Sequence, residues 1–112
     1  STVVRSLREL SSPLTTFHTT TATPWGSTQR LTTQPGYSVK RIIVHPNQKL
    51  SEAGANGSKQ WTVVEGAAWV GLGADEFELL TTQSINIAQG SGHSLENRAS
   101  QNLVLIEVQI GS

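Results

Sequence analysis

The chain contains neither cysteine nor methionine, so none of its side chains carries sulfur. Without cysteine, disulfide bonds and thiolate metal ligands are excluded. Without methionine, oxidation to a sulfoxide is excluded as well. Any metal site must therefore use nitrogen and oxygen ligands, and histidine occurs only three times.

Charge is also scarce, because charged residues make up 14% of the chain against about a quarter in a typical soluble domain. The formal net charge is zero, so the chain lacks the basic surface that attracts nucleic acid or an anionic membrane. The longest apolar run, near residues 67–72, is far too short to span a bilayer. No charged segment followed by an apolar stretch marks a signal peptide. We therefore expect no nucleic-acid partner and no membrane span. The sequence does not fix the location, and the cytoplasm or a virus particle is most compatible with it.

Neutral polar residues, mainly threonine, serine, glutamine and asparagine, are abundant instead. A surface solvated by such groups is typical of proteins that pack against copies of themselves, and of extracellular and viral coat proteins. This composition favours self-association or contact with other structural proteins.

Two parts are predicted along the chain: an N-terminal arm, residues 1–22, and a β-domain, residues 23–112. The segment VVRSLREL within the arm is compatible with a short helix. The following residues are too rich in threonine to continue a helix, because β-branched side chains lose rotamer freedom there. Pro13 interrupts the arm further, and Pro24 lies just after its end.

Short strands separated by turn residues are predicted throughout the β-domain. In the last of them the apolar residues Val104, Ile106, Val108 and Ile110 share one face. Leu103 and Leu105 lie on the other face, so the start of this strand is expected to be covered on both sides. The segment Ser51–Ser58 is predicted to be a flexible loop. The predicted strands are Ser38–Val44, Trp61–Val64, Ala67–Leu72, Glu76–Leu80, Ser84–Ile87 and Leu103–Ile110. The pattern is all-β, and closure into a double-stranded β-helix or jelly roll would remove the sheet edges.

Four segments carry a family resemblance: TPWGS at 23–27, GYSVKRIIV at 36–44, AQGSGHSLEN at 88–97 and LVLIEVQIG at 103–111. Together they resemble the cupin domain of type II mannose-6-phosphate isomerases, which also forms the C-terminal part of bifunctional mannose-1-phosphate guanylyltransferases. The segment at 88–97 keeps Gly90, His93 and Asn97 at the family's spacing. The resemblance implies a cupin jelly roll and covers about four fifths of the chain.

The resemblance also implies a metal site made by two histidines and a glutamate of a first motif and one histidine of a second. Here Trp61 and Gly66 fix the register of the first motif, which places Lys59 at the glutamate position and Gln60 at a histidine position. Only His93 of the second motif remains. An ammonium about 4 Å from a metal cation costs roughly 4 kcal/mol at an effective dielectric near 20. We therefore expect no bound metal and no cofactor.

A ligand could still occupy the mouth of the barrel. Lys40 and Arg41 alternate faces on one predicted strand, so one of them is expected to point inward and meet an anion beside Lys59 and His93. No catalytic residue is assigned. The candidate ligand-binding residues are Lys40, Asn56, Lys59, Gln60, His93 and Asn97. The tryptophans Trp25, Trp61 and Trp69 are expected to be packing anchors.

Two functional hypotheses follow. The first is a non-catalytic structural or assembly module, for example a virion decoration, coat or tail component, which associates through its arm and sheet edges. Because the usual metal ligands are replaced, this hypothesis is favoured over an enzyme. The alternative is a divergent cupin that binds a sugar or sugar phosphate, or that isomerises mannose 6-phosphate.

Overall fold

The computed structural model describes residues 19–54 and 57–111, and these residues form strands and connecting turns without any helix. Within them there is accordingly no helix long and apolar enough to cross a membrane. The ten strands are β1 (Thr19–Thr23), β2 (Gly26–Gln34), β3 (Tyr37–Val44), β4 (Lys49–Glu52), β5 (Ser58–Glu65), β6 (Ala67–Leu72), β7 (Asp75–Leu80), β8 (Ser84–Ile87), β9 (His93–Glu96) and β10 (Leu103–Ile110).

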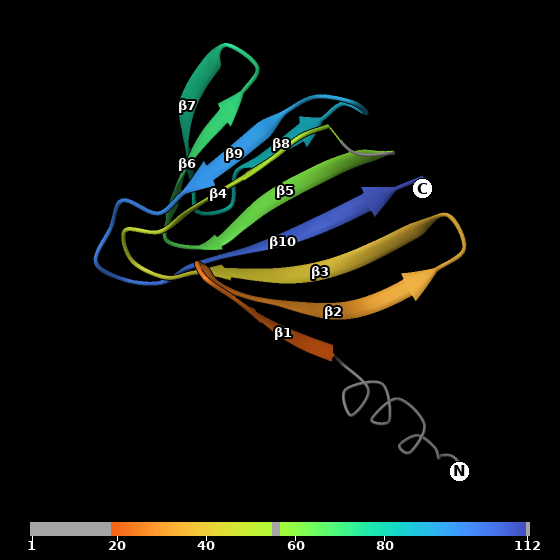
Figure 1. Ribbon diagram of the computed structural model, residues 1–112, viewed down its shortest axis with the longest axis horizontal. Coiled ribbons are helices and arrows are strands. Elements are labelled where there is room, and N and C mark those ends of the chain that lie inside the picture. The colour runs from red at the N-terminus through yellow and green to blue at the C-terminus, as the bar shows by residue number, and fades with distance from the viewer. Residues whose placement is uncertain (1–18, 55–56, 112) are drawn as a thin grey trace.

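The strands form two antiparallel sheets (Figure 1). One sheet has six strands in the order β1-β2-β3-β10-β5-β8, and the other has four in the order β4-β9-β6-β7. The strands of the larger sheet converge where β3 ends and β10 begins, which we call the closed end, and spread apart toward the open end, where β5 and β9 begin. The expectation of an all-β domain is confirmed.

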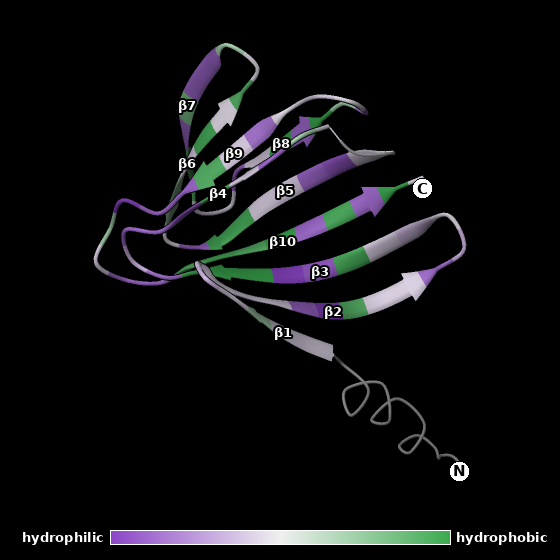
Figure 2. Cartoon of the chain, viewed as in Figure 1, coloured by the Kyte–Doolittle hydropathy of each residue, from purple (hydrophilic) through white to green (hydrophobic). Residues whose placement is uncertain are grey.

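A hydrophobic core fills the space between the sheets at the closed end. Figure 2 shows the end of β3 and the start of β10 as hydrophobic, with hydrophilic segments of both strands lying nearer the open end. Trp61 is the largest fully buried side chain, and Trp25 packs against the core from the turn between β1 and β2. The buried core residues are Ile42, Val44, Leu50, Trp61, Val63, Ala68, Val70, Leu79, Ile87, Leu95, Leu103 and Leu105.

Strand β10 shows how burial changes along one element. Leu103, Val104 and Leu105 are all buried, so the start of the strand is covered on both sides as predicted. Farther along, the outer face carries Ile110, which is 57% exposed. The inner face there carries a carboxylate, Glu107, which is only 4% exposed.

Two segments differ from the sequence-based expectation. Strand β4 includes Ser51 and Glu52, which were predicted to be loop; these polar residues are extended because β4 pairs with β9. Strand β1 begins at Thr19, within the residues assigned to the arm, because Thr19–Thr23 pair with β2 in an antiparallel ladder. The predicted helix within residues 1–10 lies outside the described residues.

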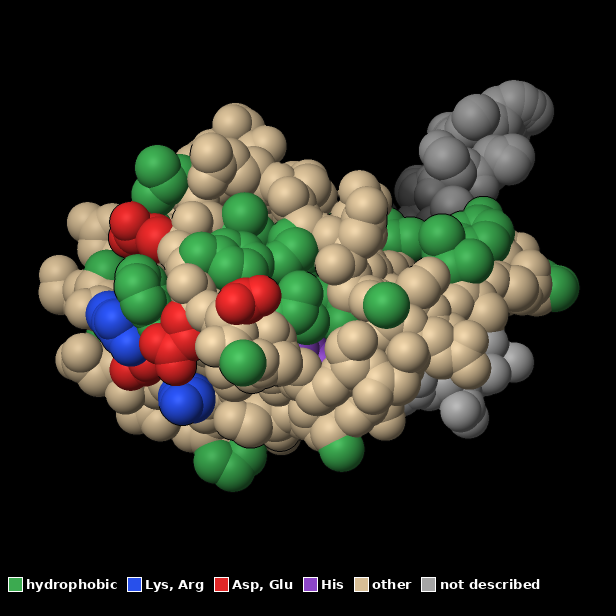
Figure 3. Space-filling view, turned by 90° about the horizontal axis from the view of Figure 1, so that it is seen from above, with side chains coloured by type: hydrophobic (Ala, Val, Ile, Leu, Met, Phe, Trp, Pro, Cys, Tyr) green, Lys and Arg blue, Asp and Glu red, His purple; other side chains and the backbone are tan. Residues whose placement is uncertain are grey.

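Most of the surface seen in Figure 3 is neither charged nor hydrophobic, which matches the polar but uncharged composition. Acidic and basic side chains gather at one end of this face, and hydrophobic side chains lie near its centre.

Candidate functional site

Four strands bring charged side chains together between the two sheets at the open end. Glu52 on β4 lies directly opposite His93 on β9, and residues opposite each other in an antiparallel pair share a face. Glu107 on β10 lies opposite Trp61 on β5, which shares its face with Lys59 two residues earlier. The smaller sheet therefore supplies a carboxylate and an imidazole, and the larger sheet supplies an ammonium and a carboxylate.

Lys59 lies between the two carboxylates. Its Nζ donates a hydrogen bond to Glu52 Oε1 over 2.8 Å and lies 3.7 Å from Glu107 Oε1. The same Glu107 oxygen accepts a hydrogen bond of 2.9 Å from the indole Nε1 of Trp61. Lys59 and Glu107 are both buried, whereas the Glu52 side chain is 49% exposed and faces solvent.

His93 holds Glu52 from the other side. Its Nε2 lies 2.9 Å from Glu52 Oε1, and its Nδ1 lies 2.9 Å from the carbonyl oxygen of Ser91. Both partners are acceptors when Glu52 is ionised, so His93 satisfies both when each ring nitrogen carries a hydrogen. The ring also packs edge-on against Trp61, with ring centroids 5.3 Å apart. These contacts fix the ring in one orientation.

The pKa of Glu52 reflects two opposing effects. Burial disfavours the charged form and acts to raise the pKa. The hydrogen bond and charge of Lys59, followed by those of His93, outweigh burial and hold the pKa of Glu52 below its usual value of 4.5. Glu52 is therefore ionised at neutral pH, with one side open to solvent.

A small cavity of about 50 Å³ opens beside this cluster. Glu52, Lys59 and Glu107 line it, together with Lys40 from β3. Such a volume admits a few water molecules. A ligand as large as a sugar would thus lie across the mouth and reach inward with one edge.

The residues at this place do not fit a divalent metal. The Lys59 ammonium lies between the carboxylates of Glu52 and Glu107, in contact with Glu52 and close to Glu107, and a metal cation bound there would meet its like charge. In residues 19–54 and 57–111, no three histidine or acidic side chains are arranged to hold a metal ion. That the site works without metal remains a prediction, and this geometry supports it.

The structure brings together three of the six predicted ligand-binding residues. Lys40 and Lys59 line the same cavity, and His93 contacts Glu52 at its edge. Lys40, and not Arg41, is the inward-facing member of its pair, since it lines this cavity. The binding roles of these residues remain predictions.

The other three lie elsewhere. Gln60 alternates with Lys59 on β5, so it lies on the outer face and is exposed. Asn97 is buried beyond the end of β9, where its Nδ2 donates to the carbonyl oxygens of Val44 and Gln101. Asn56 falls outside the described residues.

Sequence reasoning missed the two carboxylates. Glu107 interrupts an apolar strand, and a single carboxylate on the inner side of such a run is a usable signal for a buried, paired charge. Glu52 gave no signal, because it sits in a polar segment whose pairing with β9 only the fold reveals.

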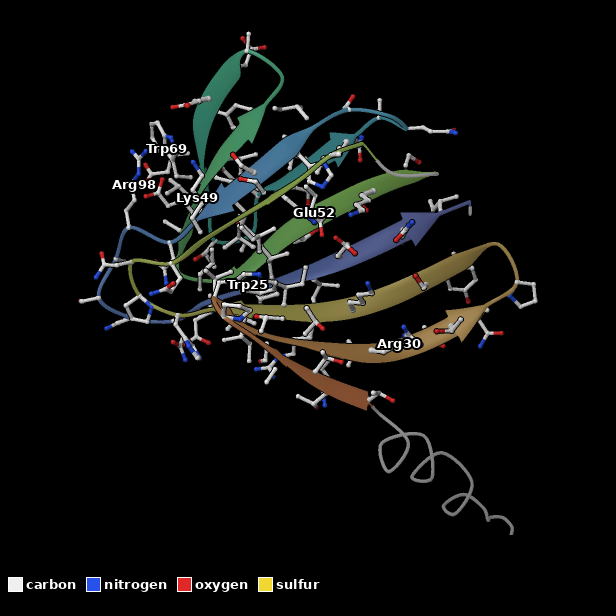
Figure 4. The ribbon with its side chains drawn as sticks, in the orientation of Figure 1. Trp25, Arg30, Lys49, Glu52, Trp69 and Arg98 are labelled. Atoms are coloured by element: carbon white, nitrogen blue, oxygen red, sulfur yellow. The ribbon has the colours of Figure 1, made fainter. Side chains whose placement is uncertain are left out.

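The three tryptophans have different surroundings. Trp61 and Trp25 are packing residues, as predicted. Trp69 lies on the outer face of the smaller sheet, where the Arg98 guanidinium lies 4.1 Å from its ring centroid (Figure 4). Its Nε1 donates to Glu76 over 3.1 Å, so both its face and its polar edge already have partners within the chain.

The sequence of the chain is similar to a known protein family and to characterised proteins. Residues 11–112 match the model of a family described as the C-terminal region of mannose-6-phosphate isomerase. The xanthan biosynthesis protein XanB of Xanthomonas campestris is 34% identical over 111 residues, which cover 98% of this chain and 24% of that protein. A mannose-1-phosphate guanylyltransferase of Escherichia coli is 39% identical over 90 residues, covering 80% of this chain and 19% of that protein.

Solved structures agree on the fold. The cupin domain of Schizosaccharomyces pombe Cnp3 superposes with a TM-score of 0.68 at 10% identity, covering 76% of this chain and 65% of that one. The expected cupin jelly roll is confirmed. The chain spans a quarter or less of the curated relatives named above, at 24% and 19% of their lengths.

The hypothesis of a non-catalytic structural or virion module was wrong. The matching relatives are named for xanthan biosynthesis and mannose-1-phosphate guanylyl transfer, which are sugar-related activities of those proteins and not structural roles in a virus particle. That hypothesis was inferred from the replaced metal-ligand positions and the polar composition, and the family match and the names of the relatives point away from it. Self-association through the arm and sheet edges remains an untested prediction.

Proposed function

The chain belongs to the family of mannose-6-phosphate isomerase C-terminal domains, and we propose that it binds a sugar phosphate across the open end and interconverts its aldose and ketose forms. Mannose 6-phosphate and fructose 6-phosphate are the proposed pair. The observation that carries the proposal is the half-exposed Glu52 carboxylate, held by Lys59 and His93 at the mouth of the cavity.

Glu52 is proposed as the base. Aldose–ketose isomerisation needs a group that takes a proton from C2 of the aldose and returns it to C1. A solvent-facing carboxylate that is ionised at neutral pH can do this, provided that it is held in one position. The hydrogen bonds from Lys59 and His93 to one oxygen of Glu52 supply that position.

Lys59 is proposed to stabilise the charge that develops on the sugar. Removal of the C2 proton leaves an enediolate, whose negative charge lies on the oxygens of C1 and C2. An ammonium fixed beside the base offers further N–H donors to these oxygens, and preorganised donors of this kind lower the barrier. A proton then moves from the C2 hydroxyl to the C1 oxygen, and Glu52 returns its proton to C1, so that the ketose forms with no charge left on either of these oxygens.

The test is turnover of mannose 6-phosphate by this chain, with formation of fructose 6-phosphate followed in a coupled assay. Glu52→Gln keeps the size of the side chain and removes the base, so kcat is expected to fall about a hundredfold or more. The matched control is Glu65→Gln, because Glu65 is exposed on β5 and forms no ion pair with any described residue. The control is expected to retain full activity.

Metal dependence is measured in the same assay. A chelator is expected to leave turnover unchanged, and added Mg²⁺, Mn²⁺ or Zn²⁺ is expected not to raise it. If the wild-type chain binds mannose 6-phosphate in calorimetry yet produces no fructose 6-phosphate under any of these conditions, isomerisation is refuted and binding alone stands.

A further inference from the structure

A pair of cations lies on the inner face of the larger sheet, beside the charge cluster and outside it. Arg30 on β2 pairs directly with Lys40 on β3, so both side chains leave the sheet on the same face. Lys40 lines the cavity beside Lys59, and this identifies the shared face as the inner one. Figure 4 shows Arg30 on β2 and Glu52 near β5, with β3 and β10 between them.

The pairing of Arg30 with Lys40 is unfavourable by itself. Like charges directly opposite each other on adjacent strands destabilise a sheet. Among the described side chains neither cation forms an ion pair, since the ion pairs there involve Lys59, His93 and Arg98. Glu107 lies opposite Lys40 on β10, but its Oε1 is bonded to Trp61 and lies near Lys59. The charges of Arg30 and Lys40 are thus available to an anion from outside.

Hydroxyl groups surround these charges. Arg30 and Lys40 line a pocket of about 200 Å³ together with Thr19 and Thr21 of β1 and Thr28 of β2. A guanidinium offers several N–H donors in a planar fork, an ammonium offers a compact charge, and hydroxyls donate further hydrogen bonds. This combination suits the three terminal oxygens of a phosphoryl group better than a carboxylate, which has only two.

The pocket adjoins the candidate active site. Thr28 and Lys40 line both the pocket and the cavity that holds Glu52, Lys59 and Glu107. Strands β3 and β5 are separated only by β10, so their backbones lie about 10 Å apart at the usual strand spacing. A hexose phosphate bound along this direction would place its phosphoryl group at one end and its C1 and C2 atoms at the other.

We infer that Arg30, Lys40 and the three threonines form the subsite for the phosphoryl group of the substrate. This inference rests on the proposed function, because the pocket is assigned to the proposed sugar-phosphate substrate. It binds the phosphoryl end of that substrate, which takes no part in the reaction. It adds Arg30 and the threonines of β1 and β2, which sequence analysis did not single out.

The test is titration of the chain with mannose 6-phosphate, inorganic phosphate, and mannose without phosphate, measured by calorimetry. Arg30→Gln and Lys40→Gln are each expected to weaken binding of mannose 6-phosphate and inorganic phosphate about tenfold or more. Mannose binding is expected to stay unchanged, since mannose has no phosphoryl group.

Arg41→Gln is the matched control. Arg41 is adjacent to Lys40 on β3 and points to the opposite face, so the variant loses the same charge without touching the pocket. Its phosphate affinity is expected to equal that of the wild-type chain. Equal losses in Arg41→Gln and Lys40→Gln would reveal a general effect of net charge and overturn the subsite.

The outcomes separate this inference from the proposed function. If Arg30→Gln and Lys40→Gln bind and turn over mannose 6-phosphate like the wild-type chain, the subsite is wrong and the isomerase proposal survives. If both variants lose phosphate affinity while the wild-type chain shows no turnover, the subsite stands and isomerisation fails.

Discussion

Glu52 illustrates how contacts from two sheets set the charge of a single residue. Lys59 and His93 both stabilise its ionised form, and together they outweigh the opposite effect of partial burial on its pKa. A carboxylate whose pKa is lower in the folded than in the unfolded state stabilises the fold at pH values above its unfolded pKa. That contribution is lost as the pH falls through the folded value.

The stability of the chain is therefore expected to depend on Glu52 in acid. Between pH 7 and pH 5 the contribution of Glu52 is fully present, and below about pH 4.5 it declines as the carboxylate takes up a proton. Urea unfolding at pH 7, 5, 4 and 3 is expected to show a steeper loss of the free energy of unfolding in wild type than in Glu52→Gln. Parallel pH profiles of the two proteins would contradict this account, and Glu65→Gln serves as the charge-matched control.

Single residues were predictable where the family pattern marked them. His93 and Lys59 were found by their positions in two motifs, and Lys40 by the alternation of a strand. Glu52 and Glu107 were not found, because each acquires its role from a partner distant in sequence: His93 is 41 residues from Glu52, and Trp61 is 46 residues from Glu107.

At the scale of elements, Asn97 fastens the loop after β9 to its neighbours. Its side chain donates to the carbonyl oxygens of Val44 and Gln101 and accepts from the N–H of Ala99. Its backbone N–H donates to Gln48, and its carbonyl oxygen accepts from Asn47. The loops on both sides of the closed end are thus joined through one buried amide.

Replacement of Asn97 is expected to destabilise the fold. Asn97→Ala leaves two carbonyl oxygens and one N–H without their partner, which costs about 2–3 kcal/mol in the free energy of unfolding. Asn102→Ala, in an exposed position of the same loop, is expected to change it by less than about 0.5 kcal/mol. Chemical denaturation measures both, and equal effects would show that the Asn97 amide has no special role.

Elements were predictable where hydrophobic residues alternate. Strand β10 was predicted from Leu103 to Ile110 as observed, and β6 and β7 were predicted to within one residue of their observed bounds. Strands β1 and β2 were missed because the sequences TTTAT and GSTQRLTTQ contain almost no large apolar residue. Such strands form because their neighbours in the sheet satisfy their backbone hydrogen bonds.

At the scale of the whole molecule, the two sheets are joined differently at their two ends. An apolar core that includes Val44 and Leu103 joins them at the closed end. At the open end, the contact of Lys59 with Glu52 and that of Trp61 with His93 cross from one sheet to the other. The charge cluster is therefore a candidate active site, and its contacts also hold the two sheets together at the open end.

A double-mutant cycle measures the interaction between Lys59 and Glu107 in this cluster. Lys59→Met is expected to lower the free energy of unfolding by about 1–3 kcal/mol, because Glu107 is then left buried without its cation. Glu107→Gln removes that charge and retains an oxygen for the Trp61 indole. The double variant is therefore expected to be more stable than the sum of the single losses predicts, by about 0.5–2 kcal/mol. Strict additivity would mean that the two residues do not interact.

The ammonium of Lys59 has a further consequence that concerns the environment of the cell. Unlike the charge of a bound metal ion, a positive charge on a side chain cannot dissociate, be replaced by another metal or be removed by a chelator. If the domain works as proposed, its performance would stay constant while the supply of trace elements rises and falls.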